Sequence, residues 1–314
     1  MPVVSRDRLV DSVLAALPAF DPATVRDIRG TLTRTVDEAG ASALETLNER
    51  LASVGSDWSH YPKDPLASLI HELLAGRVLG PGSKLLGHGH LRSVAGKAVV
   101  IFANHLSYAD ANLLEVLIRQ SGNAALADRL TVVAGPKVYS SLRRRFSSLC
   151  FATVKTPQNS RLSTEDAVMT PREVARAARR SIDAARDRLR QGAALLVFGE
   201  GTRSRTGRMQ RMLPGAVRYF EQSRTSVLPI GIAGTEALFP IDCERLRQSD
   251  IVVRVGRPFD ADTLLRKAGG DRRLAMDCVG LALASLVPDA YRGTYGGNGE
   301  GLDRARRLLA NLYD

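Results

Sequence analysis

From about Lys97 onward, short apolar segments alternate with segments of helical periodicity, and this alternation limits the possible folds more than any other feature of the chain. The predicted strands span residues 97–103, 130–135, 150–155, 193–198, 227–232 and 250–255. The predicted helices span residues 109–119, 138–146, 171–190, 213–222 and 271–287. Such alternation is typical of an α/β fold. We therefore predict a mixed, largely parallel central sheet that is flanked by helices.

The first 80 residues have a different pattern, in which each of four helical segments has one apolar stripe and a polar back. Asp21-Pro22 is a typical helix start, with Asp as the cap and Pro at the first helical position. Four such helices are typical of a small helical bundle, which would pack against the α/β part of the chain. We predict a helical domain over residues 1–80, an α/β domain over residues 81–290, and a tail with a short helix over residues 291–314.

The composition indicates an ordinary globular protein of 314 residues, of which 44% are hydrophobic. The three cysteines are widely spread and odd in number, so a disulfide framework is not expected; they are Cys150, Cys243 and Cys278. No cluster of His, Cys or carboxylate residues has the spacing of a metal site, and none is predicted. The start of the chain lacks the apolar region of a signal peptide, and no run of residues is long and apolar enough to span a bilayer. We expect a cytoplasmic protein without a transmembrane helix.

One predicted strand ends in a polar segment that suits general-base chemistry. The strand reads Val-Val-Ile-Phe-Ala and is followed at once by Asn104 and His105, with Asp110 five residues beyond the histidine. A histidine on a rigid element titrates near neutral pH, and an aspartate one turn away can orient its ring. The pair would deprotonate a hydroxyl or amine of a substrate. The alternative is a capped helix start with a histidine that only packs.

A second predicted strand breaks into the sequence Gly199-Glu200-Gly201-Thr202-Arg203-Ser204. Its glycines allow a tight turn close to a ligand, and its arginine offers a planar fork for a phosphate. Glu200 would hold Arg203 or orient an acceptor. Ligands of α/β folds bind at strand ends, so both blocks are predicted to meet in one crevice.

Together the two blocks resemble the lysophospholipid and glycerol-phosphate acyltransferase superfamily. Its motif Asn-His-x-Ser-x-x-Asp is matched by Asn104, His105, Ser107 and Asp110. Its motif Phe-Pro-Glu-Gly-Thr-Arg-Ser is matched by Phe198 and residues 200–204, with Gly199 in place of the usual Pro. An apolar strand with a proline, Val227-Leu228-Pro229-Ile230-Gly231-Ile232, fits a further motif. The resemblance covers about residues 85–260.

The chain departs from the family at another motif, because the common string Phe-Ile-Asp-Arg is absent. The sequence there resembles the soluble glycerol-3-phosphate acyltransferases, which have a basic cluster after this strand. By that resemblance, Lys155 and Arg161 are candidates for the phosphate of the acceptor, together with Arg203. The alternative is a solvated loop of positive charge.

The resemblance implies acyl transfer from a thioester, acyl-CoA or an acyl-carrier protein, to the hydroxyl of glycerol-3-phosphate, lysophosphatidate or another lysolipid. His105 and Asp110 would form the general base, with no covalent intermediate and no cofactor beyond the thioester. Backbone amides of the 199–202 turn would stabilise the oxyanion. The expected substrate-binding residues are Asn104, Ser107, Lys155, Arg161, Glu200, Gly201, Thr202, Arg203 and Ser204. The alternative function is a non-catalytic lipid- or acyl-carrier-binding protein on the same fold.

Positive charge is concentrated in one part of the chain. Residues 137–211 contain 17 Lys and Arg against 6 Asp and Glu, a net charge of +11 that equals that of the whole chain. This basic segment would attract an anionic membrane surface, an acidic acyl-carrier protein or the phosphates of coenzyme A, or it is a solvated face. It lacks interleaved aromatic residues, so nucleic acid is not an expected partner. We expect peripheral contact with a membrane.

Overall fold

The computed structural model describes residues 4–157, 169–221, 224–241, 243, 245–297 and 301–313. Within these ranges, nine strands form one mixed sheet in the order β1-β5-β4-β6-β3-β7-β8-β2, with β9 paired to β7. The strands are β1 (His60–Tyr61), β2 (Lys84–Leu86), β3 (Val99–Ala103), β4 (Leu130–Ala134), β5 (Ala152–Lys155), β6 (Ala194–Phe198), β7 (Ser226–Ala233), β8 (Val252–Val255) and β9 (Phe259–Asp260). The centre, from β5 through β4, β6 and β3 to β7, is parallel. The predicted fold class is confirmed.

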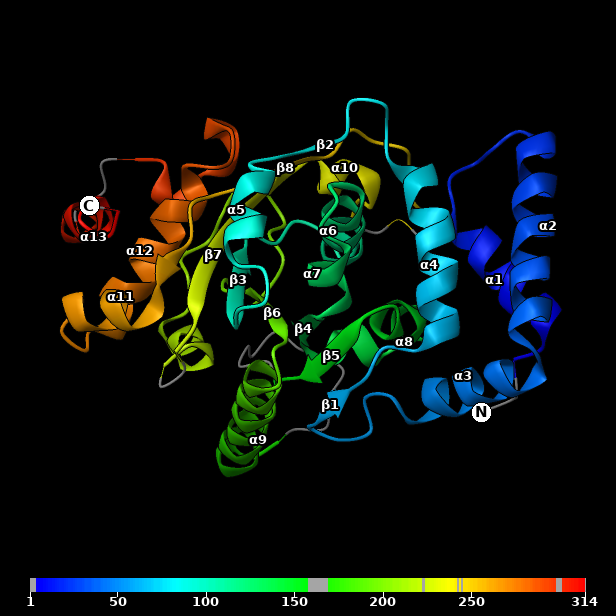
Figure 1. Cartoon of the computed structure of the whole chain (residues 1–314), viewed down its shortest axis with the longest axis horizontal. Coiled ribbons are helices and arrows are strands. Elements are labelled where there is room, and N and C mark those ends of the chain that lie inside the picture. The colour runs from blue at the N-terminus through cyan, green and yellow to red at the C-terminus, as the bar shows by residue number, and fades with distance from the viewer. Residues whose placement is uncertain are drawn as a thin grey trace.

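The helices lie on both faces and at both ends of this sheet (Figure 1). The α-helices are α1 (Arg6–Ala16), α2 (Pro22–Ala39), α3 (Ala41–Ser53), α4 (Pro65–Val78), α5 (His88–Ser93), α6 (Asp110–Gln120), α7 (Ala124–Asp128), α8 (Leu142–Leu149), α9 (Pro171–Arg190), α10 (Thr235–Leu238), α11 (Ala261–Lys267), α12 (Arg272–Ala284) and α13 (Asp303–Ala310). The 3₁₀ helices are η1 (Pro136–Tyr139), η2 (Pro214–Tyr219), η3 (Asp289–Tyr291) and η4 (Gly293–Tyr295).

The central strand β3 shows how the sequence builds two core layers. Successive side chains of a strand point to opposite faces. Val99, Ile101 and Ala103 accordingly join one buried cluster, with the helices α1 to α4, α6 and α8. Val100 and Phe102 join a second cluster, with α9, α12 and α13. A strand that is apolar at every position therefore separates two helical layers.

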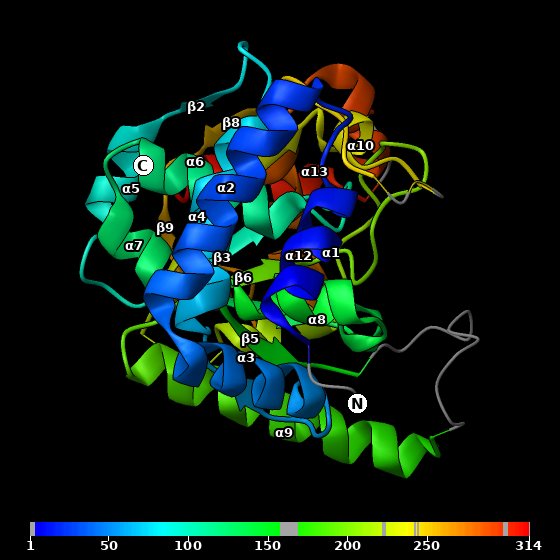
Figure 2. The ribbon, with the colours of Figure 1, turned by 90° about the vertical axis from the view of Figure 1, so that its right-hand side faces the viewer.

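The N-terminal helices start where the sequence predicts, because their caps are local. Asp21 accepts hydrogen bonds from the first turn of α2, and the buried Asp64 does the same for α4. Helices α1 to α4 lie together at one end of the molecule (Figure 2). They share their apolar cluster with the sheet, and His60 and Tyr61 form an edge strand on β5. The division into three domains stays a prediction.

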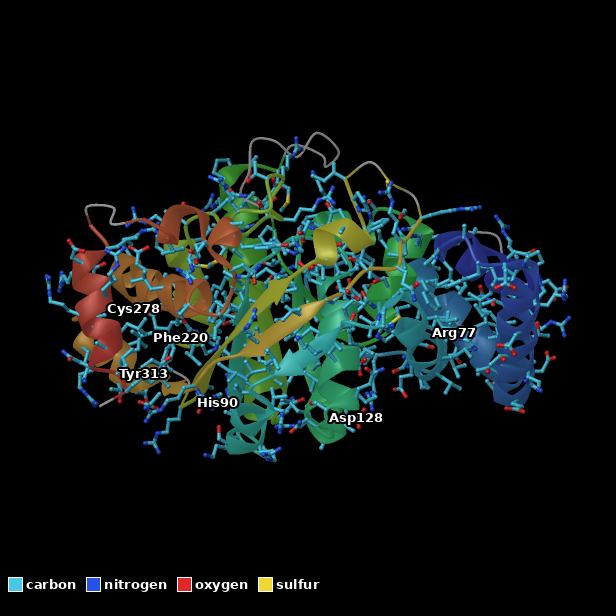
Figure 3. All side chains as sticks on the ribbon, turned by 90° about the horizontal axis from the view of Figure 1, so that it is seen from above. Arg77, His90, Asp128, Phe220, Cys278 and Tyr313 are labelled. Atoms are coloured by element: carbon cyan, nitrogen blue, oxygen red, sulfur yellow. The ribbon has the colours of Figure 1, made fainter. Side chains whose placement is uncertain are left out.

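The opposite end of the molecule contains α11, α12 and α13. In Figure 3, Phe220 and Cys278 lie at this end, whereas Arg77 lies among the N-terminal helices. The segment predicted as a helix over residues 213–222 is the 3₁₀ helix η2. Strands β1, β2 and β9 have only two or three residues each, too few to produce a periodic signal, and the sequence analysis missed them.

Candidate functional site

Asn104 fixes the end of β3 from which the site is built. Its side chain is fully buried and makes two hydrogen bonds to the backbone of Ile232 on β7. The amide donates to the Ile232 carbonyl at 2.9 Å, and the side-chain oxygen accepts from the Ile232 N–H at 2.8 Å. One buried amide group thereby satisfies two backbone groups and holds β3 against β7 where the strands end.

His105 and Asp110 form the pair that the sequence predicts. Asp110 is the first residue of α6 and is fully buried, and its Oδ2 lies 2.8 Å from Nδ1 of His105. The same oxygen accepts the backbone N–H groups of Leu106 at 2.7 Å and Ser107 at 3.0 Å. Because Nδ1 of His105 faces the carboxylate, Nε2 is the ring nitrogen directed away from it. The histidine ring also stacks on Phe198, with 4.1 Å between ring centroids.

Thr235 is a further member of this arrangement, and the sequence analysis did not find it. Its hydroxyl donates to Oδ1 of Asp110 at 2.5 Å. Both oxygens of the carboxylate are therefore hydrogen-bonded, which fixes its orientation. Thr235 follows β7 and lies 125 residues from Asp110, so the only sequence signal was its place just after the proline-containing strand.

Glu200 connects the turn after β6 to the segment that contains His105. It is 4% exposed, and its Oε1 accepts the backbone N–H of His105 at 2.9 Å while Oε2 accepts that of Gln210 at 2.7 Å. Burial raises the pKa of Glu200 to about 7. Ser204 adds a second tie, since its N–H donates to the carbonyl of His105 at 2.7 Å. The described bonds of Glu200 thus hold the backbone of the histidine, and none of them is to Arg203.

The turn after β6 depends on its glycines. Gly201 has a φ of +74°, and a Cβ there would lie 2.4 Å from Cδ1 of Leu213. At Gly199 a Cβ would lie 2.6 Å from Sδ of Met212, so the chain packs tightly at the position where the family usually has proline. The N–H of Gly201 donates to the carbonyl of Phe198. Of the amides of the 199–202 turn, that of Gly201 is therefore engaged by a carbonyl, and the role of this turn in stabilising an oxyanion stays a prediction.

Two arginines gather over one aromatic ring beside the histidine. The guanidinium groups of Arg203 and Arg144 lie 4.3 and 4.7 Å from the ring centroid of Tyr108. Tyr108 in turn packs edge-on to His105, with 6.4 Å between centroids. Cation–π contacts hold these cations in defined positions. Arg203 is thus near His105, as predicted, and Arg144 is an additional cation that the sequence analysis did not assign to the site.

The other predicted residues have different surroundings. Lys155, at the end of β5, donates to the carbonyl of Gly55 at 2.7 Å and lies 4.4 Å from the ring centroid of Trp58. Ser107 is buried and accepts the N–H of Ala109, and Thr202 is exposed. Arg161 lies outside the described residues.

An apolar groove adjoins the histidine. It has a volume of about 360 Å³ and runs between α1, α4, α6 and α8. Its lining includes Tyr108 and Ala109, from the loop that contains His105, and it extends to apolar residues of the N-terminal helices. The latter are Val4, Leu9, Val13, Ala16, Leu17, Leu51, Ile70, Leu74, Ala75 and Val78. The N-terminal segment therefore contributes directly to a cavity that reaches the loop after His105, at Tyr108 and Ala109.

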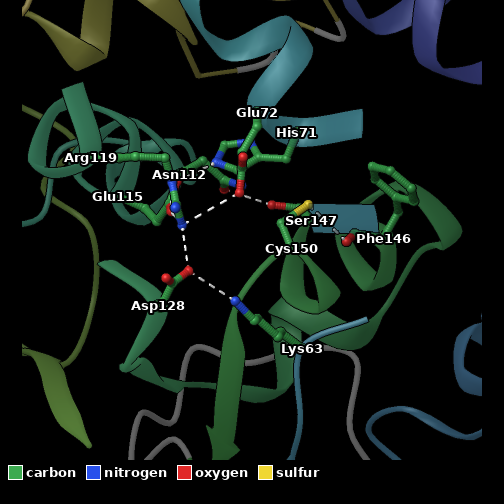
Figure 4. A network of polar contacts seen from close by, with 10 residues as sticks. All are labelled: Lys63, His71, Glu72, Asn112, Glu115, Arg119, Asp128, Phe146, Ser147 and Cys150. Carbon is green, nitrogen blue, oxygen red and sulfur yellow. Dashed lines mark hydrogen bonds and ion pairs between the residues drawn. The ribbon is translucent and has the colours of Figure 1, made fainter. Parts of the chain in front are cut away.

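A polar network backs one wall of this groove (Figure 4). His71 lines the groove, and its Nε2 lies 3.2 Å from Oε2 of Glu115, which also bonds Arg119. Burial opposes ionisation of Glu115, but the close contacts of its carboxylate with His71 and Arg119 outweigh it, so the pKa of Glu115 is lowered. Asp128 joins Arg119 to Lys63 at the surface. The network connects α4, α6 and α7 behind the groove.

Comparisons with known proteins found one family model, a relative and a solved structure that are similar to parts of this chain. Residues 84–233 match the family model described as Acyltransferase. A 1-acyl-sn-glycerol-3-phosphate acyltransferase of Cocos nucifera is 30% identical over 80 residues, which are 26% of this chain and 26% of that protein. The alignment thus spans about a quarter of that relative. The crystal structure of the 1-acyl-sn-glycerophosphate (LPA) acyltransferase PlsC from Thermotoga maritima covers 63% of this chain and 71% of its own, with a TM-score of 0.43 and 17% identity.

No helix among the described residues is both long and apolar enough to cross a membrane. The family match contains the histidine block, the block after β6 and all of β7. The comparisons thus support the resemblance of residues 84–233 to the lysophospholipid and glycerol-phosphate acyltransferase superfamily.

Proposed function

We propose that this protein transfers a fatty acyl group from an acyl thioester to the hydroxyl of a glycerol-phosphate or lysophospholipid acceptor. One observation supports this most strongly: the His105–Asp110 pair lies beside an apolar groove. A general base needs a reacting hydroxyl within reach, and a fatty acyl chain needs an apolar cavity. The short separation between the pair and the groove, whose lining includes Tyr108 and Ala109, supports this proposal.

In the proposed reaction, Nε2 of His105 takes the proton of the acceptor hydroxyl while its oxygen attacks the thioester carbonyl. The tetrahedral intermediate then collapses with cleavage of the carbon–sulfur bond. The imidazolium returns its proton to the departing thiolate, so a thiol and an ester are formed. Asp110 stabilises the imidazolium between these steps, and the Thr235 hydroxyl keeps the carboxylate in place.

Arg203 is proposed to bind the phosphate of the acceptor, since its guanidinium is fixed over Tyr108 next to His105. Asn104, Ser107, Glu200, Gly201 and Ser204 shape the site through the backbone contacts described above, and Thr202 offers an exposed hydroxyl. We favour 1-acylglycerol-3-phosphate as the acceptor. Lys155 bonds the carbonyl of Gly55 and lies over the rings of Trp58 and Tyr139, whereas a glycerol-3-phosphate enzyme was expected to direct this lysine to the phosphate.

The test is thiol release from palmitoyl-CoA by the purified chain, with 1-acylglycerol-3-phosphate, glycerol-3-phosphate or no acceptor. Acceptor-dependent release is expected, and His105→Ala should abolish it. The matched control is His88→Ala on α5, where the histidine is exposed and away from the described site. If no acceptor stimulates release from palmitoyl-CoA or a palmitoylated acyl-carrier protein, yet the chain binds either donor, the alternative of a non-catalytic binding protein holds.

A further inference from the structure

Residues 289–295 contact the segment that follows the turn after β6, although they lie outside the family match. They contain the 3₁₀ helices η3 and η4, and we call them the C-terminal strap. The N–H of Met209 donates to the carbonyl of Tyr291 at 2.8 Å, and the N–H of Thr294 donates to the carbonyl of Met209 at 3.1 Å. A Cβ at Gly293 would clash with the carbonyl oxygen of Met209, so the two backbones are in direct contact.

The segment paired with the strap also supports the histidine. The N–H of Gln210 donates to Oε2 of Glu200 at 2.7 Å, and Oε1 of the same carboxylate accepts the N–H of His105. Tyr295 of the strap holds this segment at a further point, since its hydroxyl accepts the N–H of Met212 at 2.9 Å. The strap is therefore connected to the backbone of His105 through Glu200.

Tyr291 connects the strap to the aspartate by a second route. Its hydroxyl donates to Oε1 of Glu236 at 2.5 Å. Burial and the neighbouring carboxylate raise the pKa of Tyr291 to about 12, so the hydroxyl keeps its proton and remains a donor. Glu236 adjoins Thr235 in the four-residue helix α10, and the hydroxyl of Thr235 donates to Asp110. Glu236 and Tyr291 also line one hollow of about 490 Å³ together with Leu106, so this contact lies close to the site.

We propose that Tyr291 is a positioning residue of the site: through Glu236 it keeps the hydroxyl of Thr235 on the carboxylate. This inference rests on the proposed function and adds to it a residue outside the family match. Asp110 stabilises an imidazolium only while its carboxylate faces Nδ1 of His105. Movement of α10 would pass to that carboxylate through the hydroxyl bond, and the contact of Tyr291 with α10 restrains this movement before a substrate binds.

The first test is a double-mutant cycle between Tyr291→Phe and Thr235→Val, with kcat for acyl transfer as the readout. Tyr291→Phe removes only the hydroxyl and keeps the backbone contact with Met209. It should lower kcat about fivefold, as expected for the net loss of one hydrogen bond, and leave KM for donor and acceptor unchanged. In the Thr235→Val background it should have no further effect, because the route to Asp110 is already interrupted.

Two substitutions of Glu236 and one control complete the set. Glu236→Gln retains an oxygen that accepts the tyrosine hydroxyl, so it should keep the native kcat, whereas Glu236→Ala should behave like Tyr291→Phe. The matched control is Tyr313→Phe, which removes a hydroxyl that donates to the carbonyl of Arg257 and should leave kcat unchanged. Tyr313 lies at the end of the molecule that contains α11 to α13 (Figure 3).

The second test needs no acyl transfer and measures hydrogen exchange in the full chain without substrate. The backbone amides of Leu106 and Ser107 donate to Asp110, so they report on how firmly the carboxylate is held. Tyr291→Phe and Thr235→Val should each speed their exchange about fivefold, which again corresponds to one hydrogen bond. Exchange in β4 should stay as in the native chain, because the effect is local.

Four results would overturn the inference. They are additive losses of kcat in the double variant, a raised KM with unchanged kcat in Tyr291→Phe, unchanged exchange at Leu106 and Ser107, and exchange that is faster in β4 as well. The last result would mean that Tyr291 stabilises only the fold. If the native chain transfers no acyl group to any acceptor, the proposed function is rejected, and the exchange measurement alone supports or rejects the position of Tyr291 in this network.

Discussion

Asp110→Asn tests the proposed chemistry most directly, because the substitution changes the charge and leaves the shape. In the native protein, Oδ2 accepts three N–H groups and Oδ1 accepts the Thr235 hydroxyl. An asparagine can place its carbonyl oxygen where Oδ2 lies and its amide where Oδ1 lies. The hydroxyl of Thr235 can then rotate and accept from that amide. We therefore expect the variant to fold.

The loss in rate follows from the distance between the two groups. Nδ1 of His105 lies 2.8 Å from Oδ2 of Asp110. With the charge centres about 4 Å apart and an effective dielectric constant of about 20, the carboxylate stabilises an imidazolium by about 4 kcal/mol. A barrier raised by this amount slows the reaction by about three orders of magnitude. We expect kcat to fall by this factor, with KM for the acceptor nearly unchanged.

The assay is thiol release at saturating acceptor, together with thermal unfolding of each variant. Thr235→Val is the matched comparison, since it removes a hydrogen bond and keeps the charge of Asp110. It should lower kcat about tenfold, as expected for a net loss of about 1.5 kcal/mol. If Asp110→Asn folds normally and retains more than a tenth of the native kcat, the stabilisation of an imidazolium by Asp110 is refuted.

Four further predictions concern Glu200, the turn, the groove and the basic segment. The carboxyl of Glu200 has a pKa of about 7 in the native protein and of about 4.5 in the unfolded chain. As the pH rises from 4.5 to 7, the unfolded chain therefore loses this proton first, and the free energy of unfolding should fall by up to about 3 kcal/mol. Glu200→Gln should lack this fall, as measured by denaturant titrations at each pH. Gly201→Ala should cost about 1–2 kcal/mol for its left-handed backbone plus the clash with Leu213, measured against Gly207→Ala, which has the same φ of +74° and open space. Ala75→Phe in the groove should lower kcat/KM for 16-carbon donors relative to 8-carbon donors, whereas Leu73→Phe on the exposed face of α4 should not. Replacing the exposed arginines of α9, Arg172, Arg176, Arg179 and Arg180, with Gln should weaken binding to anionic but not to neutral vesicles, as measured by co-sedimentation. Unchanged vesicle binding, chain-length preference or pH dependence in these variants would contradict the respective prediction.

Local sequence determined the longer strands and most of the helices, and with them the elements on which the predicted catalytic residues lie. Apolar segments such as residues 99–103 predict buried strands because every side chain is covered, and the helix cap at Asp21 acts within one turn. The contact between His105 and Asp110 spans five residues, so spacing alone predicted it. These features were found because the interactions that define them are short in sequence.

The tertiary structure decided the contacts between distant segments. Asn104 meets Ile232 across 128 residues, Asp110 meets Thr235 across 125, and Glu200 meets His105 across 95. No periodicity or spacing indicates such pairs, because only the order of parallel strands brings them to one edge of the sheet. The same is true of the apolar groove, whose walls include N-terminal helices outside the matched family region. The sequence thus determined which residues are available for chemistry, and packing decided which of them share a site.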